Sequence, residues 1–463
     1  MSNLWTGEVV GFQPLFIKDE FMGFAIASKN NKVFYDRDAN YNALLAEAKS
    51  VIVFDGYAIN RRLNDFVQAK HNLRTLYFQV NSQNRFQTVK DLIKYEYYTE
   101  DNSNYTCLGN TARVEGSKQT ILEASFIRNY YLKHHKEVSK AILKTDNSLL
   151  KEFSQKRNLV RVNQLAVRAD MSEYQLKQWN AEREIFHLVG HPVVSTLQLS
   201  YKQQQDKTIQ NLFEQKNLGK SKYESLIHYL DVEELDLQFD ITATATGRIL
   251  CRADGLGLFA PDNSYKQNFL APKNYAFISA DYSKQEASIL AYVTDDKRLQ
   301  KDLQNKHYYA KLAKLLTGIE DKQTGKDLFY ALTYGISDKA LADKLGISEN
   351  RAEYIKQELR ERYPGLTSWL KKVKTLKTNY FGRKLYESTA NAYVQSTAAD
   401  IVRLKLLETI DFNPVCVFSD NIIYSVPVVN VTKCKDELKT ILEDIKPFKL
   451  SVTMKCSENL KFS

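Results

Sequence analysis

The chain has 463 residues, which is long enough for two or three domains with substantial hydrophobic cores. It carries 65 Lys and Arg against 55 Asp and Glu, and the net charge of +10 favours a polyanionic partner such as nucleic acid over a membrane. We expect neither a membrane span nor a signal peptide, because no long apolar run is present and the first residues lack a basic and an apolar region. The five scattered cysteines form no CxxC pair, which indicates neither a zinc site nor a disulfide framework and favours a cytoplasmic setting.

Residues 1–150 are predicted to form an α/β domain. Strand-like runs at Lys32–Tyr35 and Val51–Phe54 flank a helix-like run at Ala43–Lys49. The polar stretch Lys144–Ser148 is the best candidate for a linker to the rest of the chain.

Residues 180–230 have a strongly helical composition that is interrupted by the basic, glycine-containing segment Lys216–Lys222. This pattern predicts two helices joined by a basic tip, a thumb-like hairpin that can touch phosphate groups. An ordinary solvated helical hairpin is the alternative, and the segment alone favours that alternative.

The segment from Phe277 to Ala291 changes from a strand pattern to a helix pattern. A short apolar run delivers one carboxylate, Asp281, to its end, and a helix-like stretch with a second acid, Glu286, follows at once. Acids at strand ends are common, so this segment alone is a moderate indication of an active site.

A second segment runs from Lys322 to Gly335. Lys322, Lys326, Tyr330 and Tyr334 are spaced four apart, so on a helix they form one stripe with two cations followed by two aromatic rings. Such a face can hold a triphosphate at one end and a sugar and base at the other. The alternative is a helix with a solvated basic end and a buried aromatic end.

A third segment, Pro414–Pro427, places Ser-Asp-Asn between two apolar runs, which predicts a hairpin with Asp420 at its tip. Apolar runs lead up to both Asp281 and Asp420, so both acids are expected at the edge of one buried sheet. Two adjacent carboxylates repel unless a divalent cation lies between them. Mg²⁺ prefers one or two carboxylates plus substrate phosphate oxygens, which is the arrangement that two-metal phosphoryl transfer requires.

With these three segments the chain resembles family A (polymerase-I-like) DNA polymerases over roughly residues 150–463. Further strings that are similar to the family are Thr244–Arg248, Phe269–Pro272, Arg362–Gly365 and Asn391–Asp400. Each string is weak alone, and their number and order support the resemblance.

The resemblance implies a mixed α/β (α+β) fold of the right-hand polymerase type. It has a palm with an antiparallel sheet, helical fingers and a helical thumb, beside an N-terminal α/β exonuclease-like domain. The expected boundaries are 1–150 for the exonuclease-like domain and 151–463 for the polymerase domain, with the thumb at about 155–235, the palm at about 236–294 and 386–463, and the fingers at about 295–385.

The resemblance also implies residue roles at the reacting phosphate. Asp281 and Asp420 would bind two Mg²⁺ ions, for which Mn²⁺ can substitute, with the carbonyl of Tyr282 as an extra ligand. Lys326 would hold the incoming triphosphate and stabilise charge on the pyrophosphate leaving group. Lys322 stands where the family usually has an arginine, so it keeps the charge and loses the bidentate geometry.

Other implied roles concern the rest of the nucleotide. His307 matches a family histidine that contacts the phosphates, and a helix-surface histidine is the alternative. Glu286 and Tyr330 would enclose the 2′ position of the sugar.

The remaining implied roles concern the DNA. Tyr334 would stack near the templating base, and Gly335 would permit close approach of the backbone. Arg248, Asn391 and Gln395 would contact the minor groove of the primer–template near the growing end. Minor-groove acceptors are degenerate, so such contacts check the shape of a base pair and not its sequence.

Several positions depart from the family pattern. Asn421 replaces the usual glutamate after the second aspartate, and Ser419 replaces the histidine before it. Gln285 stands in a normally apolar place, and Glu387 stands where the family tends to carry an arginine. None of these removes a metal-binding aspartate, and together they bear on rate and fidelity.

The N-terminal region lies where relatives carry a 3′–5′ exonuclease. The segment Val51–Leu63 is similar to the middle exonuclease motif without its aspartate. A first-strand Asp-x-Glu pair is missing, since Asp19 is followed two positions later by Phe21, and no Tyr-x-x-x-Asp occurs near residues 126–135. We interpret this region as a degenerate exonuclease-like domain retained as a scaffold or DNA platform.

The sequence therefore predicts a DNA polymerase that extends a primer on a template with dNTPs, without proofreading. A phage or mobile-element replication enzyme is the expected setting, with a host repair or translesion polymerase as an alternative, and processivity or replication accessory proteins are further expected partners. A catalytically impaired DNA-binding relative is another alternative, against which Asp281, Asp420 and Lys326 argue. An RNA polymerase is a third, against which Glu286 argues.

Overall fold

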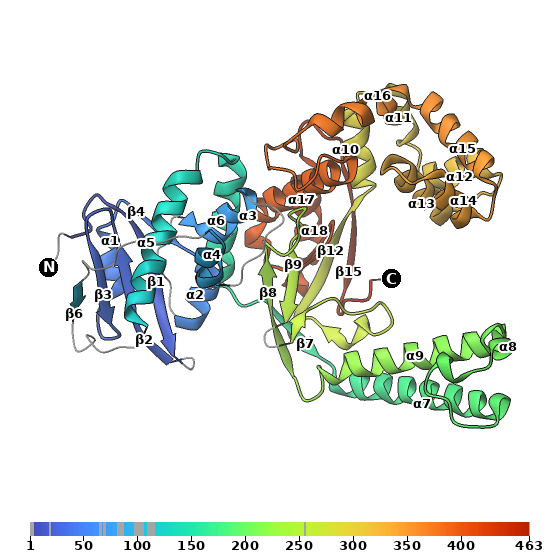
Figure 1. The fold of residues 1–463 in the computed structure, drawn as a ribbon, viewed down its shortest axis with the longest axis horizontal. Helices are drawn as coiled ribbons and strands as arrows, with labels where there is room; N and C mark the ends of the chain where they lie inside the picture. The colour runs from blue at the N-terminus through green and yellow to red at the C-terminus, as the bar shows by residue number, and fades with distance from the viewer. Residues whose placement is uncertain are drawn as a thin grey trace.

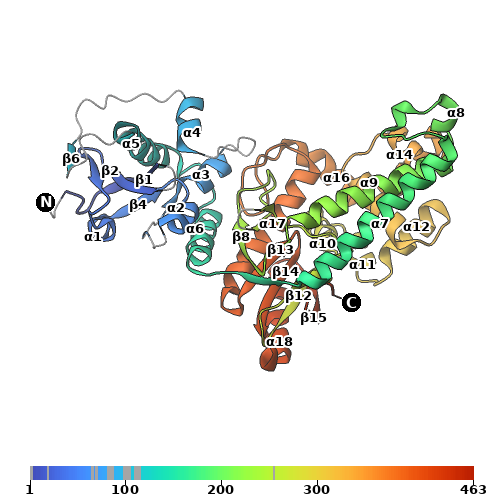
Figure 2. The same ribbon diagram turned by 90° about the horizontal axis from the view of Figure 1, so that it is seen from below.

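The computed structural model describes residues 4–17, 20–63, 67, 71–80, 88–96, 106–108, 116–253 and 256–462 (Figure 1). A unit built on one mixed sheet contains the N-terminus. The remainder of the chain surrounds an antiparallel sheet, and a long helical hairpin and a group of helices extend from it on the side away from the N-terminal unit (Figures 1 and 2).

The N-terminal unit has a six-stranded sheet in the order β5-β4-β1-β2-β3-β6. Its strands are β1 (Val9–Ile17), β2 (Glu20–Ala27), β3 (Lys32–Asp36), β4 (Ser50–Val53), β5 (His71–Asn72) and β6 (Thr106–Leu108), and its helices are α1 (Tyr41–Ala46), α2 (Gly56–Leu63), α3 (Leu73–Val80), α4 (Val89–Tyr95) and α5 (Ser117–His134). Both predicted strands are confirmed, and the predicted helix is shifted to α1. Helix α5 packs so closely on β1 that a Cβ at Gly11 would lie 1.9 Å from the carbonyl oxygen of Ala124.

The predicted linker at Lys144–Ser148 is wrong, because these residues lie inside α6 (Lys140–Gln155). The helix buries Leu149 and Phe153 on one side, and on the same side the carboxylate of Asp146 is almost fully buried. Asp146 is paired with a buried arginine, Arg403, at 2.5 Å. The polarity of this stretch favours a linker in the sequence, because the partner of Asp146 lies more than 250 positions away in the chain.

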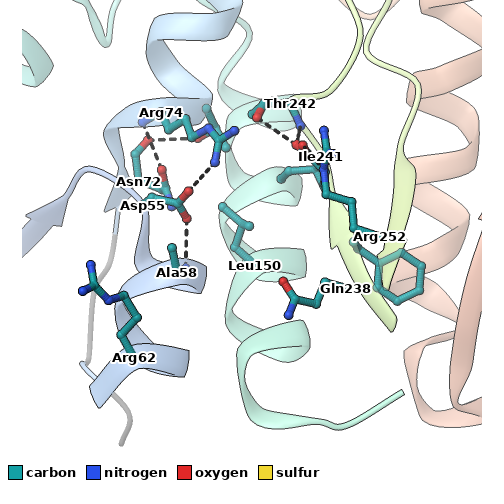
Figure 3. A pocket seen from close by; sticks show the side chains of 13 residues that line it. Asp55, Ala58, Arg62, Asn72, Arg74, Leu150, Gln238, Ile241, Thr242 and Arg252 are labelled. Carbon is teal, nitrogen blue, oxygen red and sulfur yellow. Dashed lines mark hydrogen bonds and ion pairs between the residues drawn. The ribbon is translucent and has the colours of Figure 1, made fainter. Parts of the chain in front are cut away.

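A polar cavity of about 630 Å³ lies between the N-terminal unit and the strands that follow it (Figure 3). On one wall Arg74 is paired with Asp55, and on the other Arg252 donates to Asp240 at 3.1 Å. The charges of Asp55 and Asp240 both act on Arg74 and raise the pKa of its guanidinium against the effect of burial. The two walls therefore attract each other across the cavity.

The long hairpin consists of α7 (Gln164–Val189) and α9 (Lys207–Ile227), with η1 (Thr196–Gln198) and α8 (Tyr201–Gln204) at its tip. The predicted basic tip at Lys216–Lys222 is wrong, because this segment lies inside α9. Gly219 serves helix packing: a Cβ there would lie 2.9 Å from the carbonyl oxygen of Tyr174 on α7. Lys216 is buried and donates to the carbonyl oxygen of Val193 at 3.2 Å.

Two antiparallel sheets form the centre of the larger unit. One has the order β10-β9-β8-β7-β11 and contains β7 (Leu159–Val162), β8 (Glu234–Asp240), β9 (Leu250–Ala253), β10 (Gly257–Leu258) and β11 (Phe269–Leu270). The other has the order β13-β14-β12-β15 and contains β12 (Tyr275–Ser283), β13 (Pro414–Phe418), β14 (Asn421–Pro427) and β15 (Ser451–Ser457). The second sheet confirms the predicted antiparallel sheet and its strands.

Helices cover these sheets and form the group that extends from them. They are α10 (Gln285–Val293), α11 (Lys297–Asp302), α12 (Tyr308–Thr317), α13 (Lys322–Thr333), α14 (Asp338–Leu345), α15 (Glu349–Arg362), α16 (Pro364–Lys372), α17 (Ala390–Glu408) and α18 (Val431–Glu443). One continuous core joins α17, which is buried along most of its length, to both sheets. Among the described residues, no helix has both the length and the apolar character that a bilayer crossing needs.

Candidate active site

The sheet of β12, β13 and β14 brings the two predicted aspartates together. Asp281 lies near the end of β12 and is the cross-strand partner of Asn421 in β14. Asp420 lies in the tight turn between β13 and β14, and its carbonyl oxygen accepts from the backbone N–H of Tyr282 at 3.3 Å. Residues 139 positions apart in the chain therefore meet at one edge of the sheet, as the apolar runs before them predict.

The two carboxylates influence each other electrostatically. Partial burial and then the charge of Asp420 raise the pKa of Asp281, while the nearby charge of Lys326 lowers it. Burial also raises the pKa of Asp420, against the opposing charges of Arg248 and Lys326. Neighbouring carboxylates with raised pKa values are ready to accept a divalent cation, because the cation relieves both the burial cost and the repulsion.

The unusual residues beside Asp420 have structural roles in the turn. Ser419 adopts the left-handed backbone region with φ of 62°, which allows the chain to reverse within the hairpin. The side-chain oxygen of Asn421 accepts from the hydroxyl of Ser279 at 3.0 Å. Asn421 thus joins β14 to β12 at the level of the two aspartates.

The predicted stripe lies on α13. Asp321 caps the helix by accepting from the backbone N–H of Thr324, and Lys322 and Lys326 are exposed on its first two turns. Tyr330 follows one turn later, and Tyr334 is the C-cap residue. The stripe is therefore confirmed as a helical face, and its Lys326 acts on both aspartates.

A hydrogen-bonded group surrounds Glu286 on the first turn of α10. Arg248 donates to one carboxylate oxygen at 2.6 Å, and the hydroxyl of Tyr334 donates to the other at 2.5 Å. The rings of Tyr330 and Tyr334 stack with centroids 5.7 Å apart. The hydroxyl of Tyr330 lies 3.2 Å from that of Tyr309 on α12.

Cations gather at the other end of the stripe. Lys284 directly precedes α10 with a left-handed φ of 55°, and its ammonium donates to the carbonyl oxygens of Leu303 and Asn305 at 2.6 and 2.9 Å. Burial and the charge of Lys322 lower the pKa of Lys284. His307 is exposed at the N-terminus of α12. This end of the site is suited to an anion.

The residues that are expected to contact the DNA minor groove lie on α17 and on the loop before β9. Asn391 and Gln395 are half-buried on the first turns of α17, and the side-chain oxygen of Asn391 is buried without a hydrogen-bond partner. From the same helix Arg403 donates to the carbonyl oxygen of Gly247, next to Arg248, at 2.6 Å. Gly335 has φ of 92° and open space at its Cβ position, so the backbone there is accessible.

The structure thus brings the two aspartates, Lys326, the Glu286 group and the basic end of α13 into one site. Sequence reasoning missed Lys284 and Tyr309. Lys284 had a usable signal, because it lies between Asp281 and Glu286 within the first segment. Tyr309 had none, since only helix packing brings it to Tyr330.

The donor set fits a divalent cation that is shared with a substrate. Within the described ranges, no group of three or more His, Cys, Asp or Glu side chains is arranged to hold a metal. Asp281 and Asp420 form a pair of carboxylates, which suits Mg²⁺ when phosphate oxygens and water complete its shell.

The chain has similar proteins of known family. The sequence pattern of DNA polymerase family A matches residues 84–461. The chain is similar to DNA polymerase I of Helicobacter pylori, with 28% identity over 251 residues, 46% of this chain and 28% of that protein. It is also similar to DNA polymerase I of Lactococcus lactis, with 27% identity over 233 residues, 42% of this chain and 26% of that protein. The matched segments thus span between a quarter and a third of these curated relatives.

The fold has a counterpart among solved structures. The POL domain of Pol1 from M. smegmatis, in complex with DNA primer-template and dNTP, has a TM-score of 0.81 to this structure at 15% identity, over 98% of this chain and 96% of that chain. The likeness establishes the mixed α/β polymerase fold. Since the family pattern covers most of the sequence, the chain belongs to DNA polymerase family A.

Proposed function

We propose that this chain is a template-directed DNA polymerase that adds dNTPs to the 3′-hydroxyl of a primer. One observation carries the proposal. Asp281 and Asp420 lie close together, and the ammonium group of Lys326 acts on both carboxylates, whose pKa values are raised. The M. smegmatis polymerase domain of the same fold binds primer-template DNA and dNTP, which supports the same substrates here.

In the proposed reaction the primer 3′-hydroxyl attacks the α-phosphate of the dNTP, and pyrophosphate leaves. Asp281 and Asp420 would hold divalent metal ions, with the Tyr282 carbonyl as a further ligand. When bound, Mg²⁺ or Mn²⁺ supplies a Lewis acid that eases deprotonation of the hydroxyl and neutralises phosphate charge. Lys326, on the exposed face of α13, orients the triphosphate and stabilises the charge that develops on the leaving group. Lys322 and His307 would bind the outer phosphates.

The Glu286 group would select the sugar. Arg248 and Tyr334 hold both carboxylate oxygens, so the side chain has a defined position in which it can exclude a ribose 2′-hydroxyl. Tyr330 stacks on Tyr334 and would border the 2′ position together with Glu286, while its hydroxyl would reach the 3′ side of the sugar and can substitute there for a missing 3′-hydroxyl. We therefore expect ribonucleotides to be rejected and dideoxynucleotides to be accepted readily.

The DNA would lie against the same surface. Arg248, Asn391 and Gln395 are proposed to contact the minor groove near the primer end, and the buried, unpartnered side-chain oxygen of Asn391 supports a polar partner there. Tyr334 and Gly335 would lie beside the templating base. These roles assign the palm to about 236–294 and 386–463, the fingers to about 295–385 and the thumb to about 155–235 within a polymerase domain of 151–463.

The unit of residues 1–150 is proposed to be a degenerate exonuclease-like domain. The carboxylate of Asp55 is paired with Arg74, and the buried Glu123 accepts a hydrogen bond from Gln119 at 3.2 Å. Both carboxylates therefore already have protein partners in place of a metal ion. Asp19, the acid nearest to the expected first-strand position, lies outside the described residues. A scaffold or DNA platform fits these engaged side chains.

Primer extension on a defined template with Mg²⁺ tests the proposal. Extension with dNTPs and little with rNTPs is the expected result. Extension with rNTPs only would identify an RNA polymerase on this fold. Binding of the primer–template without extension by either nucleotide set would identify a DNA-binding relative and overturn the proposed activity.

A further inference from the structure

Tyr309 on α12 makes a contact that the proposed reaction does not yet use. Its hydroxyl oxygen lies 3.2 Å from that of Tyr330 on α13. Tyr309 is 6% exposed, whereas Tyr330 is partly exposed on the face that carries Lys326. A buried hydroxyl group therefore supports, from behind, the side chain that is proposed to face the sugar.

Helix packing fixes Tyr309 in this place. A Cβ at Gly325 would lie 1.8 Å from the backbone oxygen of Tyr309, so α12 and α13 touch through their backbones. The ring of Tyr309 also packs against Tyr308 and Phe329, with centroids 5.2 and 6.0 Å away. The backbone contact and the packing of the ring restrain the position of the Tyr309 hydroxyl beside Tyr330.

The two hydroxyl groups share one hydrogen bond. Each tyrosine has a single hydroxyl proton, so one group donates and the other keeps its proton for a different acceptor. Burial raises the pKa of both hydroxyl groups, so both keep their protons at neutral pH and the geometry allows either to donate. If Tyr309 donates, the hydroxyl oxygen of Tyr330 accepts that hydrogen bond, and the hydroxyl proton of Tyr330 remains available for a different acceptor.

We propose that Tyr309 is a positioning residue for sugar selection, which donates to Tyr330 and thereby directs the proton of Tyr330 toward the incoming nucleotide. This inference rests on the proposed polymerase function and on Tyr330 facing the sugar. It adds a residue of the neighbouring helix to the specificity of the site. Readiness to accept dideoxynucleotides then depends on the pair of hydroxyl groups, not on Tyr330 alone.

The test compares wild type, Tyr309→Phe, Tyr330→Phe and the double variant on one primer–template. The quantity measured is the ratio of ddNTP to dNTP incorporation, with the dNTP extension rate as a check on folding. Tyr309→Phe is expected to reduce the ratio about two- to tenfold, the equivalent of one neutral hydrogen bond. The double variant should match Tyr330→Phe, because Tyr309 acts only through that hydroxyl.

Tyr308→Phe is the matched control, since it removes a neighbouring hydroxyl that lies beside Tyr363 and should leave the ratio unchanged. An unchanged or increased ratio in Tyr309→Phe, or additive effects in the double variant, would overturn the inference. A wild type without dNTP extension would overturn the proposed function as well. If wild type extends primers and Tyr330→Phe lowers the ratio while Tyr309→Phe does not, only the role of Tyr309 is lost.

Discussion

The guanidinium of Arg248 lies 2.6 Å from the carboxylate of Glu286 and joins the loop before β9 to the first turn of α10. Through this pair the proposed primer side of the site is bonded directly to the proposed sugar-selecting side. Glu286 is at the same time bonded to Tyr334 at the end of α13. A change at any of the three residues is therefore expected to affect the other two.

Replacing Glu286 by alanine should relax sugar selection. The variant opens the space that the carboxylate occupies, and we expect rNTP incorporation relative to dNTP to rise roughly tenfold or more, the usual size of a steric discrimination in a pocket. Single-nucleotide incorporation assays with matched rNTP and dNTP measure the ratio. Glu408→Ala, at the far end of α17, is the control and should behave as wild type. A Glu286→Ala variant that still rejects rNTPs as strongly as wild type would show that the carboxylate does not face the 2′ position.

Replacing Asp281 or Asp420 by asparagine should abolish nucleotide addition and leave DNA binding nearly intact. Loss of a metal ligand is expected to reduce the rate on the order of a thousandfold or more, since several kcal/mol of transition-state stabilisation disappear. Single-turnover extension and a DNA-binding titration separate the two effects. Asp411→Asn changes an exposed acid outside the site and should retain activity. Near-normal extension by either active-site variant would refute the assignment.

The same substitutions should stabilise the metal-free protein at neutral pH. The pKa of Asp281 is raised by partial burial and by Asp420, so the folded protein binds this proton more readily than the unfolded chain does. Stability is then lost as pH rises through the unfolded pKa toward the raised value, and the loss persists at neutral pH. Asp281→Asn should remove this loss and gain roughly 0.2–1 kcal/mol in the free energy of unfolding. Urea unfolding with a chelator, at neutral pH and at acidic pH, measures it. A gain that is equal at both pH values would contradict the electrostatic origin.

Replacing Arg403 by methionine should strongly destabilise the fold. Arg403 is fully buried and paired with Asp146 on α6, while it also donates to the carbonyl oxygen of Gly247. Removing one partner of a buried ion pair typically costs about 3–5 kcal/mol, because a charge is left without compensation. Arg168→Met breaks an exposed pair with Asp231 and should cost less than about 1 kcal/mol. Equal losses for the two variants in urea unfolding would argue against a special role of the buried pair.

The protein should not remove mismatched primer ends. We expect a labelled, mismatched primer to keep its length with Mg²⁺ and without dNTPs, because the exonuclease acids are missing from the sequence motifs of residues 1–150. Gel analysis over time measures primer length. Metal-dependent shortening that disappears in Asp55→Asn or Glu123→Gln would show that this unit is an active exonuclease.

The three motif segments could be predicted from the sequence because each depends on local rules. An apolar run that ends in Asp281 forms a strand, a spacing of four places Lys322 to Tyr334 on one helical face, and Ser-Asp-Asn between apolar runs makes a hairpin with Asp420 in its turn. Side-chain periodicity is a property of neighbouring residues, so these elements and the family resemblance required no knowledge of long-range contacts.

Long-range packing decided the rest. The polarity of Lys144–Ser148 favours a linker, but Asp146 in this segment is buried against Arg403. The composition of Lys216–Lys222 favours a hairpin tip, but Gly219 lies inside α9 and permits it to approach α7. The contact between Tyr309 and Tyr330 likewise exists only because α12 and α13 touch. Local patterns in the sequence predict the strands and the helix of the three motif segments and the chemistry that they carry, whereas long-range contacts settle which polar groups find partners. The physical reason is that burial of a charge or hydroxyl is acceptable only beside a partner that the fold brings from elsewhere in the chain.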